Sequence, residues 1–516
     1  MLAILTASLD STIVATALKK VIEEFEHQDL APWVGSAYLL TAAPFGVLYG
    51  KFADIFGRKW VTVMALGVFE LGSAICGAAS SMEMLIAGRA IAGIGGGGIF
   101  SLIVIIISDI VSIKDRGKYQ GLIGAVFGLA SVLGPLVGGA FTDNLSWRWC
   151  FYINLPLGVV TLATIVAFFN MPTPEGGLRE KLAKIDVLGA FILLLAVVAL
   201  VTPLQLGGSI WDWGSAQTIG CFVLSLVLFV VFAWVEVKFA REPILPPVMF
   251  THASVLPILL LTLSLGASFI SGSYFIALFF QIVFGQTATQ AGLSSTPQVF
   301  GLVLTSVATG ILVSKFGRYR IFFIVGPFIL AAGTVLVALM DGNTSVAARL
   351  GFLFIYGIGC GSMIQMRTIA IQAAVPQELI AVATSVAGTA MTLGGGIGIA
   401  ITGTLFNNMI VSNSANDKEL NSVIASLSAK GYNVSASETL GLLGILDGLA
   451  QQHPNDNQTA IIAAATQQLI GAFNQSFKTA YLCLLPYPVL ILFLAFFIKE
   501  VQFKPKKADD APVAAH

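Results

Sequence analysis

Three ionisable side chains stand inside apolar stretches of this sequence. Asp10 lies in LDSTIVATAL, Glu70 in VFELGSAI and Arg89 in IAGRAIAGIG. On insertion scales such a charge costs on the order of 2.5 to 3.5 kcal/mol at the centre of a membrane helix, so these residues usually face a cavity or one another. Because intramembrane charges commonly serve proton relays and substrate pathways, the three residues are our first functional candidates.

A second group of charges follows in GKFADIFGRKW, residues 50–60. This segment places the acid Asp54 near the end of one apolar run and the cations Arg58 and Lys59 just beyond it. An acid at this place would be stabilised by the positive end of a helix dipole. We expect Asp109, at the same end of another apolar run, to pair with Arg58. The alternative is a solvated basic loop.

The same pattern recurs in GILVSKFGRYR, residues 310–320, which aligns with residues 50–60 without a gap. Gly50 matches Gly310, Gly57 matches Gly317, and Arg58 matches Arg318, whereas Ser314 replaces the acid Asp54. The repeat predicts two related halves. Because the second copy lacks the acid, we expect charge pairing at the first copy of the loop and not at the second.

A glycine-rich stretch, GLIGAVFGLASVLGPLVGGAF, occupies residues 121–141. Small residues let membrane helices approach closely, and proline removes a backbone hydrogen bond and bends the helix. The Gly-Pro pair followed by Gly-Gly therefore predicts a helix that packs tightly and can move. A generic packing face would explain the glycines about as well. The residues concerned are Gly128, Gly134, Pro135, Gly138 and Gly139.

These segments must be positioned by membrane helices. The chain has 516 residues, of which 56% are hydrophobic and 10% charged, whereas soluble domains carry about 25% charged residues. Runs of about 20 apolar residues can span a bilayer. Fourteen such runs begin near Leu2, Trp33, Val61, Met84, Gly117, Phe151, Ile185, Ala216, Val255, Ala291, Ile321, Val346, Leu379 and Phe477. A net charge of zero gives no reason to expect a nucleic-acid partner, so the expected partner is lipid.

Charge placement predicts the orientation of these spans. Nineteen of the 27 Lys and Arg residues, Arg367 among them, fall on one side of the predicted topology, and an excess of this kind marks the cytoplasmic side. Both termini are then cytoplasmic. Five Asn-x-Ser/Thr sites, which can be glycosylated only on the other side, all lie there. We expect glycans at Asn343, Asn433 and Asn457, because Asn144 and Asn474 lie too near the bilayer.

The loop repeat, the segment VLGPLVGG and the segment WRWCFYINLPLG (147–158) together resemble the major facilitator superfamily, in particular its fungal fourteen-spanner drug:proton antiporter branch. The resemblance implies an all-α polytopic membrane protein with two six-helix bundles and two inserted helices. The expected divisions are 1–170 for the N-terminal bundle, 171–184 for a cytoplasmic loop, 185–236 for the inserted helices, 237–254 for a cytoplasmic linker, 255–498 for the C-terminal bundle with an external loop at 412–476, and 499–516 for a cytoplasmic tail.

The resemblance also implies roles for the residues above. Asp10 matches the acid of the family's first-helix motif and is the expected proton carrier, ahead of Glu70, which could instead be a hydrogen-bonded acid without a transport role. Arg89 matches a fixed cation that would tune proton release. Gly50, Asp54, Gly57, Arg58, Lys59 and Asp109 would form a conformational latch. The glycine-rich stretch corresponds to the antiporter motif that is associated with exporters.

Aromatic and amide side chains in the spans are candidates for a substrate cavity, which is usually apolar with a few polar groups. These are Tyr38, Tyr274, Phe279, Phe280 and Gln281, although they could equally face lipid. Other chemistries lack support. The GxGxxG at 93–98 lies within an apolar run and follows no strand, and no ATP-binding GxxxxGK[ST] occurs. The five Cys and four His form no metal pattern, and we expect neither a cofactor, a metal nor an enzyme.

The leading hypothesis is a proton-coupled multidrug or toxin exporter that moves small organic molecules across the membrane as a monomer. A vacuolar transporter of basic amino acids is the alternative with the same fold, and a non-transporting membrane sensor is the alternative of another class. The plasma membrane is the expected location, with the vacuolar membrane as the alternative.

Overall fold

The computed structural model describes residues 1–25, 30–112, 115–171, 174–207, 211–240, 242–415 and 457–500. Within these ranges the chain is helical, and its one β-type contact is an isolated bridge between Gly207 and Trp211. The N-terminal half contains α1 (Leu2–Phe25), α2 (Ala31–Phe56), α3 (Arg58–Gly77), α4 (Met82–Ile110), α5 (Arg116–Asn144), α6 (Trp149–Tyr152) and α7 (Asn154–Phe168).

The remaining helices follow in two groups. The middle of the chain forms α8 (Leu178–Ala183), α9 (Val187–Leu206) and α10 (Ala216–Lys238). The C-terminal half contains α11 (Val248–Thr251), α12 (Val255–Val283), α13 (Ala288–Ser294), α14 (Thr296–Phe316), α15 (Arg320–Ala338), α16 (Val346–Ala374), a 3-10 turn (Gln377–Leu379), α17 (Ile380–Ala415), α20 (Asn457–Leu482) and α21 (Pro486–Ala495).

The number of membrane spans agrees with the sequence. Among the described residues, 13 helical segments are long and apolar enough to cross a bilayer, and α1, which bends by 43° between Val14 and Thr16, makes a fourteenth if it is counted as one span. The all-α, fourteen-helix prediction is confirmed. Several spans start at side-chain caps, which satisfy backbone N–H groups that the helix leaves free: Ser81 accepts from Met84 N, and Ser345 accepts from Ala348 N.

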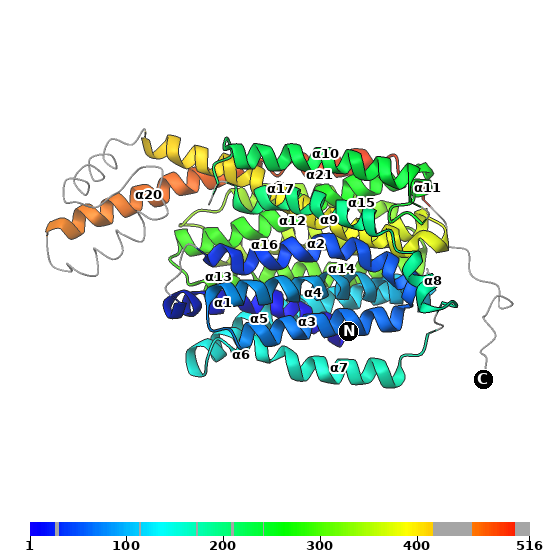
Figure 1. Ribbon diagram of the computed structural model, residues 1–516. Coiled ribbons are helices and arrows are strands. Elements are labelled where there is room, and N and C mark those ends of the chain that lie inside the picture. The colour runs from blue at the N-terminus through cyan, green and yellow to red at the C-terminus, as the bar shows by residue number, and fades with distance from the viewer. Residues whose placement is uncertain are drawn as a thin grey trace.

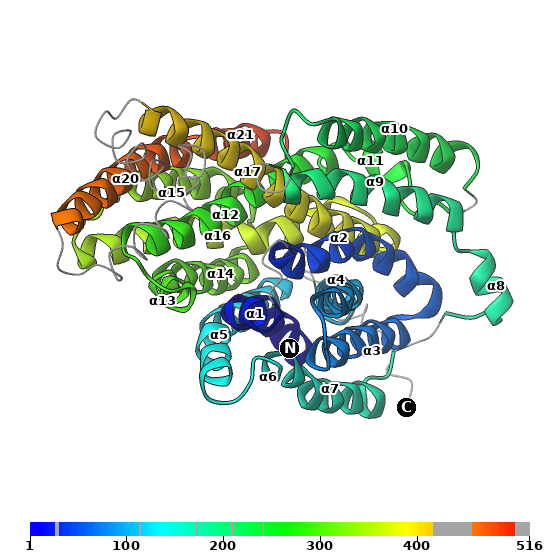
Figure 2. The ribbon, with the colours of Figure 1, turned by 60° about the vertical axis from the view of Figure 1, so that its left-hand side comes forward.

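The spans lie side by side in one bundle whose long axis follows the helices (Figure 1). In Figure 2, helices α1 to α7 form one group and α12 to α21 another, while α9 stands beside α2 and α17 and α10 packs on α9. The halves meet where α2 packs on α17 and α5 packs on α14. We call the end of the bundle where Gly57 joins α2 to α3 the latch end, and the opposite end the loop end.

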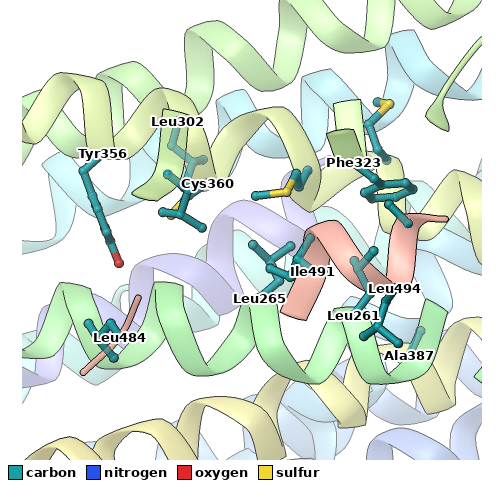
Figure 3. Close-up of a cluster of buried hydrophobic side chains, with 14 of the residues drawn as sticks. Leu261, Leu265, Leu302, Phe323, Tyr356, Cys360, Ala387, Leu484, Ile491 and Leu494 are labelled. Carbon is teal, nitrogen blue, oxygen red and sulfur yellow. The ribbon is translucent and has the colours of Figure 1, made fainter. Parts of the chain in front are cut away.

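The C-terminal half has a continuous core of buried apolar side chains, part of which Figure 3 shows. Leu261 and Leu265 of α12 pack there with Leu302 of α14, Phe323 of α15 and Ile491 of α21. Burying one such side chain contributes about 1.5 to 3 kcal/mol in water. In a bilayer, where lipid is equally apolar, close packing rather than exclusion of water holds such a core together.

The segment 412–476 was expected to be an external loop, partly helical at best. In the structure α17 continues to Ala415 and α20 begins at Asn457, while residues 416–456 lie outside the described ranges. One face of α20 is buried, since Phe473 packs against Phe406 with ring centroids 5.0 Å apart, and Asn413 donates a hydrogen bond to Ser476. The Asn and Gln residues make this segment polar overall, so its sequence did not indicate the apolar face of α20 that packs on α17.

Candidate functional site

The buried charges Asp10 and Arg89 form an ion pair between α1 and α4. Arg89 Nη1 lies 2.6 Å from Asp10 Oδ2, and the two side chains are only 3% and 0% exposed. Arg89 Nε also donates to the carbonyl of Val34 on α2, at 3.2 Å. A buried carboxylate and guanidinium stabilise each other only while both are charged, because breaking such a pair leaves an uncompensated charge. Arg89 of α4 is therefore joined to α1 through the ion pair and to α2 through the hydrogen bond.

The second oxygen of Asp10 is held by a residue that the sequence analysis did not single out. Asn154, at the start of α7, donates to Asp10 Oδ1 at 3.0 Å and to Ser73 Oγ of α3 at 3.2 Å. Asn154 is fully buried. Its position inside the WRWCFYINLPLG segment was the available signal, since a polar residue stands there among apolar ones.

Tyr38 belongs to this charge site and does not line the central cavity described below. Its ring lies under the guanidinium of Arg89, with 4.5 Å between Arg89 Cζ and the ring centroid. The aromatic face favours a cation at this distance. The tyrosine is buried, and its hydroxyl abuts Gly96 of α4. Tyr38 was expected to line a substrate cavity, and in the structure its ring stacks on Arg89.

Glu70 lies apart from the ion pair, between α3 and α7. Neither carboxylate oxygen has a hydrogen-bond partner among the described residues, and the side chain is 9% exposed. A Cβ at Gly158 of α7 would collide with this carboxylate. The absence of a side chain at Gly158 thus makes room for the buried carboxylate of Glu70. Glu70 differs from Asp10 in having no paired cation among the described residues.

The glycine-rich stretch of α5 touches both halves of the bundle. A Cβ at Gly134 would collide with Thr12 of α1, and one at Gly138 would collide with Thr16. The opposite side of α5 faces the C-terminal half, where a Cβ at Gly128 would strike Val303 of α14. Pro135 lies against Gly292 of α13, and Gly139 faces Thr289 of the same helix. The stretch therefore connects the α1 segment next to Asp10 with the other half.

At the latch end the expected pairing of Arg58 is present. Arg58 Nε lies 2.8 Å from Asp109 Oδ2 at the end of α4, and Arg58 Nη2 lies 2.9 Å from Asp54 Oδ1. Arg58 also donates to the carbonyl of Ala53. Lys59 instead donates to the carbonyl of Val166 on α7. Asp54 was expected to face a helix N-terminus, and its partner in the structure is Arg58.

The two copies of the loop share a glycine of positive φ that ends the helix, but not their charges. Gly57 and Gly317 both have positive φ, 90° and 70°, which glycine adopts without strain. Each ends its helix with an N–H donated to the carbonyl four residues earlier. In the second copy Ser314 is buried and Arg318 is exposed at the surface. The ion pairs of this loop are therefore formed by the first copy, and Ser314 offers no carboxylate for a corresponding pair in the second.

The halves are in close contact at the latch end. A Cβ at Gly50 of α2 would lie 2.6 Å from Ser385 Oγ and 2.9 Å from the carbonyl oxygen of Ala381, both on α17. Arg116 of α5 donates to Gln372 of α16 at 3.2 Å. The bundle is thus closed between α2 and α17 at this end.

A cavity of about 220 Å³ lies between the halves, enclosed by α4 and α5 on one side and by α12, α14, α16 and α17 on the other. Four residues expected in a cavity lie elsewhere. Phe279 and Phe280 are buried in the C-terminal core, where Phe279 packs on Phe477 at 4.6 Å, while Tyr274 is 52% exposed and Gln281 is exposed. The helix α12 lines the cavity through Phe269.

Arg367 lines this cavity, although the sequence analysis had placed it in a loop. It lies within α16, seven residues before the helix ends at Ala374, and its Nη1 donates to the carbonyl of Ala387 on α17. The misplacement arose because the polar residues around it, among them Gln365 and Thr368, resemble a helix end. Both are buried and line the cavity as well.

At the loop end, an acid of α1 contacts the residues that precede α6. Glu24 of α1 binds Arg148 at 2.8 Å and accepts a hydrogen bond from Trp147 Nε1 at 2.7 Å. The Arg148 guanidinium, assisted by the indole N–H, lowers the pKa of Glu24 below its ordinary value.

Of the expected glycosylation sites, Asn343 is exposed in the turn before α16, Asn457 begins α20, and Asn433 lies outside the described residues. No group of His, Cys, Asp and Glu that could hold a metal occurs in the described part of the chain.

Known proteins resemble the chain over most of its length. The family model described as "Major Facilitator Superfamily" matches residues 1–399. "MFS-type efflux pump MFS1" of Arthroderma benhamiae is 37% identical over 419 residues, which are 80% of this chain and 78% of that protein. "Efflux pump aflT" of Aspergillus parasiticus is 35% identical over 81% of this chain and 82% of its own length. "MFS-type transporter phomT" of Diaporthe leptostromiformis is 32% identical over 98% of this chain and 83% of its own.

Two solved structures share the fold. The human organic anion transporter MFSD10 aligns with a TM-score of 0.55 at 15% identity, over 96% of this chain and 97% of its own. A bacterial homologue of the human lysosomal transporter Spinster aligns with a TM-score of 0.52 at 16% identity, over 98% and 97%. At these identities the likeness concerns architecture alone. With the family model covering most of the sequence, the chain belongs to the Major Facilitator Superfamily, as a multi-pass membrane transporter.

Proposed function

We propose that this chain is a proton-coupled efflux transporter that exchanges protons for small organic molecules, and that Asp10 carries the proton. The observation that carries the proposal is the ion pair of Asp10 and Arg89, which is buried at 2.6 Å and completed by Asn154. The names of the relatives, which describe efflux pumps, support the direction of transport.

Proton binding would change the forces at this pair. While Asp10 is a carboxylate, it holds Arg89 of α4 and Asn154 of α7 against α1. A proton on Asp10 removes the negative charge and leaves Arg89 with Tyr38 and a carbonyl, which compensate a cation less well than a carboxylate does. The contact of α1 with α4 is then weakened.

The antiporter motif would pass this change to the other half. The α1 segment just after Asp10 packs on Gly134 and Gly138, and Thr12 Oγ1 donates to the carbonyl of Ala130 on α5 at 3.2 Å. The opposite face of α5 lies directly against α14 at Gly128, because glycine has no side chain to separate the two helices. A shift of α1 would therefore displace α5 against the C-terminal half. Alternating access by rocking of two halves needs such a connection.

Glu70 is the second candidate for the proton. Its carboxylate is buried without a partner and would accept a proton without breaking an ion pair. We place it after Asp10, because no described cation or hydrogen bond links Glu70 to α4, α5 or the cavity, whereas Asp10 contacts two other helices.

The latch of Arg58, Asp54 and Asp109 would stabilise the state that is closed at the latch end. In this proposal the latch end and both termini are cytoplasmic, the protein acts as a monomer in the plasma membrane, and Asn343, Asn433 and Asn457 carry glycans. A vacuolar transporter of basic amino acids is less well supported, since the described lining of the central cavity contains a cation, Arg367, and no acid.

Transport into inside-out membrane vesicles tests the proposal. Vesicles that contain the wild type receive an imposed proton gradient, acid inside, and the uptake of a panel of tritiated aromatic acids, amides and amines is measured. We expect gradient-driven uptake of some compounds, loss of that uptake in Asp10→Asn, and its retention in Glu70→Gln.

Asp115→Asn is the matched control, because Asp115 pairs with Lys118 at the surface. Wild-type uptake that does not depend on the gradient, or unchanged uptake by Asp10→Asn, refutes proton coupling through Asp10. Uptake abolished in Glu70→Gln but not in Asp10→Asn would transfer the role to Glu70.

A further inference from the structure

The central cavity contains a cation whose charge no described acid balances. Arg367 of α16 is the one charged residue in the described part of the lining, where it stands with polar and apolar side chains from both halves, among them Ser101, Gln120, Phe127, Gln365 and Thr368. Since an isolated charge in a membrane span costs several kcal/mol, its presence calls for a partner.

Two other arginines within the spans, Arg89 and Arg116, show what a satisfied guanidinium looks like in this fold. Arg89 has the carboxylate of Asp10. Arg116 uses all three of its nitrogens, donating to the carbonyls of Val111 and Ser108 and to Gln372. By contrast, Arg367 makes one hydrogen bond, from Nη1 to Ala387 at 3.2 Å, and its buried Nε has no partner within the described ranges.

A second polar group in the same cavity is also unpartnered. Gln120 of α5 is 1% exposed, and its Nε2 has no acceptor in the part of the chain that the structure describes. A buried donor without a partner costs about 1 to 3 kcal/mol. Arg367 and Gln120 come from opposite halves, so the cavity presents unsatisfied donors from both.

We propose that the central cavity binds organic acids, with the anionic oxygen of a carboxylate or acidic phenol accepting hydrogen bonds from Arg367 and a second oxygen accepting from Gln120. Arginine is suited to this because its hydrogen bonds to an anionic oxygen are charge-assisted and therefore stronger than those between neutral groups. Phe127 of α5 and Phe269 of α12 supply apolar surface for the rest of the molecule. A ligand that touches both halves would be released when they separate.

The inference rests on the proposed transport function but makes a separate demand, selectivity for anions. An amine would place a second cation beside Arg367 at low dielectric, which is strongly unfavourable. A neutral amide would leave the guanidinium charge uncompensated. The cavity, at about 220 Å³, is smaller than the range of about 300 to 1,000 Å³ that is common for ligand pockets, so a compact aromatic acid is the suitable probe.

The test measures binding to purified, full-length protein in lipid nanodiscs, where no gradient is needed. Tritiated 2-naphthoate is the probe, and unlabelled 2-naphthamide and 2-naphthylmethylamine are the competitors. We expect wild type to bind naphthoate at least about tenfold more tightly than either competitor, which corresponds to 1.4 kcal/mol. Arg367→Gln should abolish this preference, and Arg367→Lys should keep part of it.

Lys315→Gln is the control, because it removes the same charge from an exposed position at the end of α14 and should leave the preference intact. An unchanged preference in folded Arg367→Gln overturns the inference, as does the absence of naphthoate binding by wild type at millimolar concentration. Because the assay needs no proton gradient, failure of coupling through Asp10 would leave an anion preference standing.

Discussion

Gly117 at the start of α5 and Gly310 near the end of α14 approach so closely that a Cβ on either residue would meet the carbonyl oxygen of the other. Gly310 is also the repeat counterpart of Gly50, which meets α17 in the same way. The loop repeat therefore marks two places where the halves touch backbone to backbone, and both are at the latch end.

Adding bulk at Gly310 is expected to keep the latch end from closing. Overpacking of this kind typically costs 1 to 3 kcal/mol, enough to shift a conformational equilibrium by roughly fivefold to 140-fold. In Gly310→Val, a cysteine at Ser101 in the cavity should react faster with a charged thiol reagent added from the latch end. Gly67→Ala on α3, whose Cβ would meet nothing within 4 Å, is the control. Equal labelling rates in both variants would contradict this role.

Adjacent glycines of α5 should differ in their tolerance of alanine. A Cβ at Gly138 would collide with Thr16, whereas one at Gly139 would have Thr289 as its nearest neighbour at 3.7 Å, an ordinary contact. We expect Gly138→Ala to lower the thermal unfolding temperature of purified protein through a cost of about 1 to 3 kcal/mol. Gly139→Ala should be neutral or slightly stabilising, because alanine favours a helix over glycine. The reverse order would show that α5 does not use this face against α1.

The latch pair should show coupling that can be measured. Arg58 and Asp109 are 22% and 19% exposed, so their interaction is screened only in part. In a double-mutant cycle with Arg58→Gln and Asp109→Asn, we expect about 1 kcal/mol of coupling in unfolding free energy. The pair of Lys51 and Glu242, whose acid is 42% exposed, provides a comparison that should couple less. Additive effects of the two latch substitutions would mean that the contact contributes nothing.

The sequence was sufficient to predict what depends on composition and local pattern. Apolar runs predicted the spans, the loop repeat predicted two related halves, and charge complementarity predicted the contact of Arg58 with Asp109. It was not sufficient for side chains whose contacts depend on residues far away in the sequence. Nothing local shows that Tyr38 stacks on Arg89, or that Asn154, 144 positions away from Asp10, completes its hydrogen bonding. Arg367 was misplaced because polar cavity-lining residues and polar helix ends look alike in sequence.

Acid should loosen the contact between α1 and α6 at the loop end. The pKa of Glu24 is lowered, chiefly by Arg148, so the contact is fully formed above the ordinary glutamate pKa of about 4.3 and is lost as the pH falls through the lower, folded value. Trp147 fluorescence, obtained as the difference between wild type and Trp147→Phe, should be constant near neutral pH and change only below about pH 4. Glu24→Gln should remove that transition. A transition that persists in Glu24→Gln would assign it to another acid.

The orientation of the bundle can be tested by labelling single introduced cysteines in intact cells. Arg318 is exposed at the latch end and Asn343 is exposed in the turn at the loop end, so the two positions lie on opposite sides of the membrane. Because Lys and Arg favour the cytoplasmic side, a membrane-impermeant maleimide added outside should label Asn343→Cys and leave Arg318→Cys unlabelled until the cells are permeabilised. Wild type is the blank, since Cys221 and Cys483 are partly exposed. Labelling of Arg318→Cys from outside would invert the topology and, with it, the direction in which Asp10 delivers a proton.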